Sequence, residues 1–516
     1  MNNPTPVYST AEIREIERLA ATLPNPPRLM EKAGLAAAQI AKDKLLISDK
    51  NKILVLAGPG NNGGDALVAA LHLYAWGFQV TTVFTGESSR LSQDAKQALN
   101  NWQSAGGELH SEIPPSETWH IVIDGLFGIG LSYAERPLDE KYQRMIETVN
   151  DMNLPTLAID IPSGLSADNG FAPNTAIKAT ITATFIGLKP GLLTHDGCNY
   201  SGEIILCPLD LDTVSRKNSQ SWLLDQTMMT RLLPPPRPAN SHKGIFGSVG
   251  IIGGSSGMVG AALLAGSAAI KLGAGRVYLG LLANHPPKVD PVHPELMLRS
   301  ADELFELNNL NCLIVGPGLG KELAACLCLE KALGTSLPLV LDADALNLIA
   351  FYPELANMLC ARKAPSLLTP HAAEAARLLN TDTATVQNNR LKAAENLVKR
   401  FNCAIVLKGA GSICMLPNDN CYFNASGNPG LSSAGTGDVL SGMIGAFLVQ
   451  GLSSEQALLL AVYLHGAAAD DLLASLHGPI GMTASEIVDS ARRLLNQWVY
   501  GRSARPRYAH HTYSNY

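Results

Sequence analysis

One carboxylate, Asp438, stands at the junction between a glycine-rich turn and an apolar helical run in residues 428–442. The turn ends in Gly-Thr-Gly-Asp. Backbone N–H groups at such a helix start are unpaired and carry partial positive charge, so they attract phosphate. Asp438 could take a proton from a hydroxyl held beside that phosphate. The alternative is a helix N-cap, for which Asp is a favoured residue.

A second glycine-rich turn lies in the first half of the chain, where residues 58–65 read Gly-Pro-Gly-Asn-Asn-Gly-Gly-Asp. Gly58, Gly60 and Gly63 satisfy the Gly-x-Gly-x-x-Gly pattern of dinucleotide-binding folds. The neighbouring asparagine pair and Asp65 add polar groups that a simple phosphate turn does not need. The alternatives are a nicotinamide oxidoreductase and a plain strand-to-helix turn with an Asx cap.

Two further acids of the first half each come at the end of an apolar segment. Asp124 begins Asp-Gly-Leu-Phe-Gly-Ile-Gly, and Asp160 begins Asp-Ile-Pro-Ser-Gly, which contains Ser163. In a parallel sheet these segments would meet at one edge. Their oxygen atoms suit a hard cation as well as sugar hydroxyls.

The second half has further motifs of the same kind: Gly-Pro-Gly-Leu-Gly at 316–320, Asp-Ala-Asp at 342–344, Thr-Pro-His at 369–371 and Lys-Gly-Ala-Gly-Ser at 408–412. A single His371 is by itself more typical of a helix cap or a core histidine, and Lys408 of a solvated loop. The Walker A pattern is absent from the sequence.

Short apolar runs alternate with helical patterns, which predicts two α/β segments with parallel sheets covered on both faces. We expect strands at 52–57, 79–84, 120–123 and 156–161, and helices at 9–21, 29–43, 65–76, 92–104 and 140–149. The second segment should have strands at 247–252, 276–281, 312–315, 338–341, 366–368 and 403–407, and helices at 258–272, 436–449 and 454–473. The Pro-rich residues 212–242 are the expected linker, and the alternative for part of this segment is that it packs on the second domain.

The composition excludes several function classes. The 516 residues carry a formal charge of −6, so there is no basic footprint for nucleic acid. The nine cysteines are dispersed, which favours reduced thiols and a cytoplasmic location. The N-terminus has no apolar signal-peptide segment, and the apolar run at 258–270 is too short for a membrane span. We therefore expect no membrane partner.

The first-half motifs, together with Thr-Phe-Ile-Gly-Leu-Lys-Pro-Gly at 184–191, resemble the NAD(P)H-hydrate epimerase domain over residues 8–210. The resemblance implies a Rossmann-like three-layer domain that interconverts the R and S epimers of hydrated NADH and NADPH, with bound K⁺. It implies Asp160 as the acid/base, with Lys189 as a second candidate. K⁺ would be held by Asn62, Asp124 and Ser163. Nucleotide contacts are implied at Asn61, Asn62, Gly63, Gly64, Asp65, Gly128, Ile129, Gly130, Leu131, Ser132, Tyr133, Ala134 and Asp160.

Two residues depart from the epimerase pattern. Ala66 stands where the family usually has Gly, and Ile129 stands where it usually has Thr. A side chain at Ala66 would narrow the approach of a ligand to the backbone. Ile129 removes a hydroxyl contact.

The second-half motifs, together with Ser-His-Lys-Gly at 241–244, resemble the ADP-dependent NAD(P)H-hydrate dehydratase, a ribokinase-like α/β/α domain, over residues 225–500. The whole chain is therefore similar to the bifunctional NAD(P)H-hydrate repair enzymes. The resemblance implies that Asp438 is catalytic, and that the hydrated dinucleotide contacts Ala262, Gly318, His371 and Asp438. Contacts to the adenine nucleotide are implied at Lys408, Gly409, Ala410, Gly411, Ser412 and Gly437.

The expected organisation is an epimerase domain at 1–215, a dehydratase domain at 225–501 and a disordered tail at 502–516. NADHX, NADPHX and ADP would be the small-molecule partners, with Mg²⁺ in the dehydratase domain and a homo-oligomeric assembly. Three alternatives remain from the residues alone: a ribokinase-like kinase of a vitamin alcohol, a nicotinamide oxidoreductase and a non-enzymatic nucleotide-sensing module.

Overall fold

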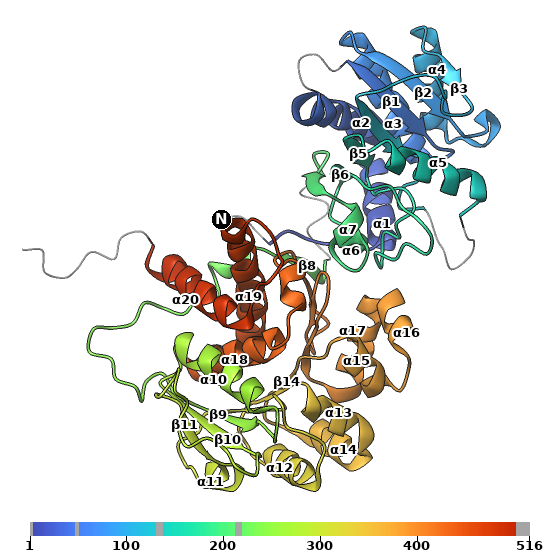
Figure 1. Cartoon of the computed structure of the whole chain (residues 1–516). Helices are drawn as coiled ribbons and strands as arrows, with labels where there is room; N and C mark the ends of the chain where they lie inside the picture. Colours follow the sequence, from blue (N-terminus) through green and yellow to red (C-terminus); the bar gives the residue numbers. More distant parts are fainter. Residues whose placement is uncertain (1–3, 47–50, 131–137, 212–218, 502–516) are drawn as a thin grey trace, which may run out of the picture.

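A computed structural model describes residues 4–46, 51–130, 138–211 and 219–501 of the chain. Two α/β domains follow one another along the sequence (Figure 1). The expected tail at 502–516 and the expected domain end at 215 lie outside the described residues.

Within the described residues, the first domain has a seven-stranded parallel sheet in the order β3-β2-β1-β4-β5-β6-β7. Its strands are β1 (Lys52–Ala57), β2 (Gln79–Phe84), β3 (Leu109–His110), β4 (Ile121–Gly125), β5 (Thr156–Ile159), β6 (Ile181–Phe185) and β7 (Glu203–Cys207). Its α-helices are α1 (Thr10–Ala21), α2 (Leu29–Ile40), α3 (Asn61–Ala75), α4 (Gln93–Ser104), α5 (Glu140–Asp151), α6 (Pro190–Leu193) and α7 (Gly197–Tyr200).

The two faces of this sheet bury different side chains of the same strand. On β1, Ile53 and Val55 pack in the core with α1–α4, whereas Leu54 and Leu56 pack in the core with α5. A strand with apolar residues on both faces must be covered on both sides. The expected three-layer α/β architecture is confirmed.

The second domain has a ten-stranded sheet, counted over the described residues, in the order β11-β10-β9-β12-β13-β14-β15-β16-β17-β8. Its strands are β8 (Ser221–Leu224), β9 (Ser248–Gly253), β10 (Arg276–Leu281), β11 (Met297–Ser300), β12 (Cys312–Val315), β13 (Leu339–Leu341), β14 (Ser366–Leu368), β15 (Ala404–Leu407), β16 (Ile413–Met415) and β17 (Cys421–Asn424). Its α-helices are α9 (Gln226–Met229), α10 (Val259–Lys271), α11 (Ala301–Phe305), α12 (Leu323–Leu333), α13 (Asp344–Phe351), α14 (Pro353–Ala361), α15 (Ala372–Leu379), α16 (Thr383–Asn388), α17 (Arg390–Phe401), α18 (Thr436–Val449), α19 (Ser454–Leu476) and α20 (Ala484–Tyr500).

Strand β8 lies inside the segment expected as a linker, yet it joins the second sheet beside β17. Its other edge is met by the start of the chain, where Leu223 N donates to Thr5 O at 2.8 Å and Val7 N donates to Ser221 O at 2.9 Å. These hydrogen bonds tie the N-terminal segment to the second domain.

The α3 helix begins at Asn61 rather than at the expected residue 65. Two glycines therefore lie in its first turn, where they are normally unfavourable. Close packing explains them, because a Cβ at Gly63 would lie 2.0 Å from Gly58 O, and one at Gly64 would lie 2.6 Å from Met30 Cε.

Among the described residues, α19 is the one helix long and apolar enough to cross a membrane by these two measures. It packs between α18 and α20, and its apolar side chains contribute to the core of the second domain. A buried helix in a protein core can have the same length and hydropathy, so these two properties do not identify α19 as a membrane span.

The two domains meet around a buried arginine, Arg390, whose side chain bridges them. Its Nε donates to Thr194 Oγ1 of the first domain at 3.0 Å, and its Nη2 donates to Leu407 O at 3.1 Å. Thr194 Oγ1 in turn donates to Gly411 O at 2.9 Å. The turn after β15 is thereby held against the first domain.

We expect Arg390→Ala to lower the free energy of unfolding by about 2–4 kcal/mol, because it creates a cavity and leaves Leu407 O without its donor. Urea unfolding followed by circular dichroism measures the effect. Lys399→Ala, on the exposed face of the same helix, is the control and should change stability by less than about 0.5 kcal/mol. Equal stability of both variants would contradict a structural role for the bridge.

Candidate functional site

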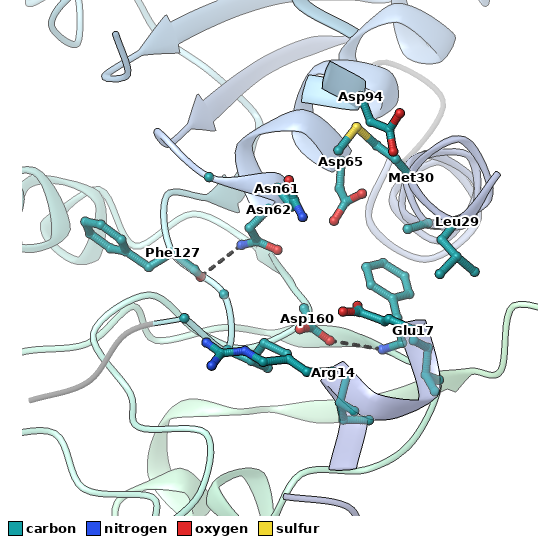
Figure 2. A pocket seen from close by; sticks show the side chains of 18 of the residues that line it. Arg14, Glu17, Leu29, Met30, Asn61, Asn62, Asp65, Asp94, Phe127 and Asp160 are labelled. Carbon is teal, nitrogen blue, oxygen red and sulfur yellow. Dashed lines mark hydrogen bonds between the residues drawn. The ribbon is translucent and has the colours of Figure 1, made fainter. Parts of the chain in front are cut away.

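The first domain has a cavity of about 630 Å³ at the carboxyl edge of its sheet, here called the first-domain cavity. Asn61, Asn62 and Asp65 enter it from the start of α3, and Asp160 enters from the end of β5 (Figure 2). Helices α1 and α2 close the opposite wall with Arg14, Glu17, Leu29 and Met30, residues that sequence analysis did not select. Four carboxylates, those of Glu17, Asp65, Asp94 and Asp160, therefore face one cavity.

Asp160 has a left-handed backbone, with φ of +65°, directly after β5. Such a conformation is uncommon outside glycine, although Asp and Asn adopt it more easily than other residues. Its Oδ1 accepts hydrogen bonds from Phe185 N at 3.2 Å and from the fully buried Lys189 Nζ. Lys189 also donates to Thr184 Oγ1 at 2.9 Å and to Phe185 O at 2.8 Å. The ion pair thus holds a carboxylate at the cavity wall.

Burial, with the charge of Asp160 next, raises the pKa of Asp65 well above its usual range. The same two causes raise the pKa of Glu17. Carboxyl groups that share a cavity and differ in environment divide into proton donors and proton acceptors. The cavity therefore places two carboxyl groups with a raised pKa, those of Asp65 and Glu17, beside Asp160.

Behind the cavity, a buried cluster joins the other polar residues selected from the sequence. Asp124 accepts from Ser163 Oγ at 2.6 Å, from Ser163 N at 2.8 Å and from Leu126 N at 3.2 Å. Asn62 Nδ2 donates to Phe127 O at 2.9 Å. Burial raises the pKa of Asp124 to about 6 despite the hydrogen bonds from Ser163. Asn62, Asp124 and Ser163 therefore converge on residues 125–128.

The expected glycine contacts of the first domain divide into two groups. Gly128, Ile129 and Gly130 line the cavity. Gly63 and Gly64 instead pack against Gly58 and Met30. The expected contacts at Leu131, Ser132, Tyr133 and Ala134 lie outside the described residues.

The Ala66 side chain, a departure from the epimerase pattern, does not line the cavity. It is fully buried and faces Gly125, where a Cβ would lie 2.5 Å from Ala66 Cβ. The other departure, Ile129, does line the cavity.

In the second domain, the start of α18 brings Asp438 toward a lysine–carboxylate pair. Gly435 precedes the helix with φ of +88°. Lys408, directly after β15, donates to Asp342 Oδ1 at 2.8 Å, and Ser441 Oγ donates to Asp342 Oδ2 at 2.8 Å. A Cβ built at Gly437 would lie 3.3 Å from Lys408 Nζ, so backbone and ammonium group are close together.

Burial, and then the charge of Asp342, raises the pKa of Asp438 to about 7. The charge of Lys408 opposes this shift without cancelling it. A general base is most effective when its pKa lies near the working pH. Asp438 is the third residue of α18, whose N-cap is Gly435, so it is not the helix N-cap.

His371 caps α15, with its Nδ1 accepting from Ala373 N at 3.1 Å. Its backbone forms an isolated parallel β-bridge with that of Lys408. Burial, followed by the charges of Lys408 and Arg377, lowers the pKa of His371. Burial and the neighbouring Lys408 ammonium thus disfavour the protonated imidazole.

Gly318 lies against the start of α10, because a Cβ there would be 2.5 Å from Met258 O. The same helix contributes the fully buried Ala262. Gly318 therefore brings the 316–320 turn and α10 together at the sheet edge that also carries His371 and Lys408.

Residues 408–412 form the turn after β15 that faces the first domain. Ala410 O accepts from His195 N at 3.1 Å, Gly411 O accepts from Thr194 Oγ1, and Ser412 Oγ donates to Gly409 O at 3.2 Å. A Cβ at Gly411 would lie 1.7 Å from Leu193 O. Only glycine permits this approach.

Asp342 lies in a motif that the sequence shows but to which no role was assigned, and Ser441, Glu374 and His465 were not predicted. Glu374 is 5% exposed and accepts from His371 N at 2.8 Å. His465 is buried beneath the start of α18, and burial lowers its pKa to about 4. The Asp-Ala-Asp motif after a strand was the signal available for Asp342, whereas Ser441 and His465 lie within apolar helices and give none.

Comparison with known proteins agrees with this division into two domains. Residues 27–191 match the family described as YjeF-related protein N-terminus, and residues 249–493 match the family described as NAD(P)H-hydrate dehydratase. The chain is 37% identical to the bifunctional NAD(P)H-hydrate repair enzyme of Escherichia coli K12, over 96% of this chain and 94% of that protein. It is 36% identical to the corresponding Coxiella burnetii enzyme, over 95% of this chain and 100% of that protein.

Among solved structures, the chain resembles the ADP/ATP-dependent NAD(P)H-hydrate dehydratase of Bacillus subtilis, co-crystallised with ATP and Mg²⁺. That protein is 32% identical, with a TM-score of 0.48, and the match covers 54% of this chain and 98% of that one.

Proposed function

The chain belongs to the family of bifunctional NAD(P)H-hydrate repair enzymes, and from this premise we propose that the first-domain cavity is its epimerase site and the start of α18 its dehydratase site. The enzyme interconverts the R and S epimers of NADHX and NADPHX, and it dehydrates the S epimer to NADH or NADPH at the expense of ADP. The observation that carries the assignment is the pair of separate half-buried carboxylates, Asp160 and Asp438, each at the carboxyl edge of its own sheet.

In the epimerase site, Asp160 is proposed as the acid/base at C6 of the hydrated ring. Taking the proton from the C6 hydroxyl lets the C6–N1 bond break, giving an aldehyde and a ring-opened enamine nitrogen that takes up a proton. Closing the ring on the other face, with return of the proton to oxygen, gives the other epimer. Lys189 fixes the carboxylate for both proton transfers.

In the dehydratase site, Asp438 is proposed to take the proton from the C6 hydroxyl as its oxygen attacks the terminal phosphoryl group of ADP, with AMP leaving. The start of α18 and Lys408 stabilise the charge on the phosphoryl oxygens. Phosphate then departs with the C6–O bonding pair, and loss of a C5 proton restores the ring double bond.

K⁺ is proposed at the buried cluster of Asn62, Asp124 and Ser163. Oxygen donors of this kind suit hard cations, and the buried Asp124 carboxylate, whose pKa is raised to about 6, would be stabilised by a cation. Bound there, K⁺ would supply positive charge behind the 125–128 turn of the cavity.

We expect Asn62→Ala to raise the K⁺ concentration for half-maximal epimerisation by at least about tenfold, because it removes one oxygen ligand. Separating the two epimers by chromatography, at fixed ionic strength with choline replacing K⁺, measures the rate. Dehydration of the S epimer by the same variant is the control and should follow the wild-type K⁺ dependence. An epimerisation rate that does not depend on K⁺ concentration in either the wild type or the variant would contradict the assignment of K⁺ to this site.

ADP, or ATP, is proposed to contact Lys408, Gly409, Ala410, Gly411, Ser412 and Gly437, with the hydrated dinucleotide at Ala262, Gly318, His371 and Asp438. Mg²⁺ would accompany the phosphates, held mainly by their oxygens and by water, with the half-buried Asp438 carboxylate as a hard ligand at the start of α18. A cytoplasmic location and a homo-oligomer stay predictions.

The test is to incubate the purified chain with a mixture of hydrated NADH epimers, with and without ADP. We expect NADH absorbance to recover almost completely with ADP, with AMP and phosphate in equal amounts, and not to recover without ADP. A lasting phosphorylated product, without NADH, would instead identify the second domain as a small-molecule kinase.

A further inference from the structure

A second cavity of about 630 Å³ lies in the second domain between α13 and α15, and no role has been given to it so far. Its wall includes Lys321, Asn347 and Arg377, together with the aromatic residues Phe351 and Tyr352. We call it the α13–α15 cavity.

This cavity adjoins the proposed dehydratase site at two points. Lys321 directly follows Gly320, in the turn that carries Gly318, and Arg377 lies on the helix that His371 caps. Asp344 joins these walls, because its Oδ2 accepts from Gly320 N at 2.9 Å and its Oδ1 accepts from Asn347 Nδ2 at 3.5 Å. The charge of Arg377 also contributes to lowering the pKa of His371, after burial and Lys408.

The cavity and the turn proposed for ADP follow different strands of the sheet. The cavity walls follow β12, β13 and β14, whereas residues 408–412 follow β15. A dinucleotide whose nicotinamide ring reaches Asp438 must extend away from the ADP. The α13–α15 cavity shares no lining residue with the contacts proposed for ADP.

The lining combines positive charge with exposed aromatic surface. Within the described part of the chain, neither Lys321 nor Arg377 forms an ion pair with a carboxylate, and Arg377 Nη1 donates to Asn347 Oδ1 at 2.7 Å. Phe351 is 75% exposed, and its ring lies 4.9 Å from that of Tyr352, nearly perpendicular. Unpaired cations bind phosphate, and exposed aromatic faces stack on purine bases.

We infer that the α13–α15 cavity receives the adenosine half of the hydrated dinucleotide, with the purine on Phe351 and the 2′-phosphate of NADPHX between Lys321 and Arg377. The inference rests on the proposed function of the second domain. Since NADHX carries a hydroxyl in place of that phosphate, these two cations give the dehydratase its preference between the two substrates.

The experiment measures KM and kcat of the full chain for S-NADPHX and S-NADHX at saturating ADP. For Arg377→Gln combined with Lys321→Gln, we expect KM for NADPHX to rise at least about tenfold, because charge-assisted contacts are lost. KM for NADHX should rise far less, and kcat for NADPHX at saturation should stay within about twofold. Phe351→Ala should raise both KM values by a similar factor.

Lys363→Gln is the matched control, because Lys363 is an exposed lysine that lines a different, smaller cavity of the same domain. It should change neither KM. Equal KM increases for both substrates in the double variant would overturn the phosphate assignment, and unchanged values in every variant would overturn the cavity as a subsite. A lower oligomer mass of Phe351→Ala with unchanged KM would assign the surface to a second copy of the chain.

Failure of the proposed function has a different signature. If the proposed function is wrong, the wild-type chain will dehydrate neither substrate. If only the subsite is wrong, the wild-type chain will dehydrate both substrates, and the substitutions at Lys321 and Arg377 will not change the preference between them.

Discussion

Asp438→Asn should slow ADP-dependent dehydration of the S epimer by about two to four orders of magnitude, the usual contribution of a general base. The amide keeps the shape and hydrogen-bonding capacity of the side chain but cannot accept the C6 hydroxyl proton. KM for ADP should stay within about threefold, because the substitution leaves the proposed nucleotide contacts, residues 408–412 and Gly437, in place. Initial rates at saturating ADP measure the effect.

Loss of folding would not explain this result. Burial and the charge of Asp342 disfavour the ionised Asp438, so a neutral amide should leave the thermal unfolding midpoint unchanged or higher. Asp489→Asn, at an exposed position of α20, is the matched control and should keep wild-type rates. Near-normal dehydration by Asp438→Asn would show that another group takes the proton.

The pH dependence of kcat/KM for dehydration is an independent test of Asp438 as the general base. The base is active as a carboxylate, and its pKa in the free enzyme is raised to about 7. kcat/KM for dehydration should therefore increase tenfold per pH unit below about 7 and level off above it. This limb should be missing from the residual activity of Asp438→Asn.

The second large effect is expected from Asp160→Asn, which should slow conversion of the R to the S epimer by about two to four orders of magnitude. Asn tolerates the left-handed backbone at this position, so the change tests the carboxylate rather than the turn. Chromatographic separation of the epimers without ADP measures the rate.

Dehydration of the pure S epimer by Asp160→Asn should remain at the wild-type rate. When the Asp160→Asn variant is given a mixture of hydrated NADH epimers and ADP, only the S epimer should be converted quickly to NADH. Equal loss of both activities would contradict two separable sites. Circular dichroism is the folding control, because the variant leaves the buried Lys189 without its counter-ion.

The alternation of apolar runs and helical patterns was enough to predict most parallel strands of both sheets. Each such strand is apolar on both faces, so the signal is local and strong. Strand β8, with the sequence Ser-Trp-Leu-Leu, was missed because it is only four residues long and lies in the segment expected as a linker; it is held by pairing with β17 and with the N-terminal segment. The start of α3 was misplaced because Gly63 and Gly64 are helix breakers by propensity, and only packing against Gly58 and Met30 explains them.

The sequence by itself determined the chemistry of the molecule: the acids after apolar strands, the glycine-rich turns and the motif order that identifies the family. Those features are encoded by residue type at short spacing. Only the tertiary structure decided that Glu17 of α1 shares a cavity with Asp160, and that Asp342 is hydrogen-bonded to Lys408 and Ser441. These partners are far apart in the chain, and their proton affinities depend on burial and neighbouring charge, which no local pattern contains.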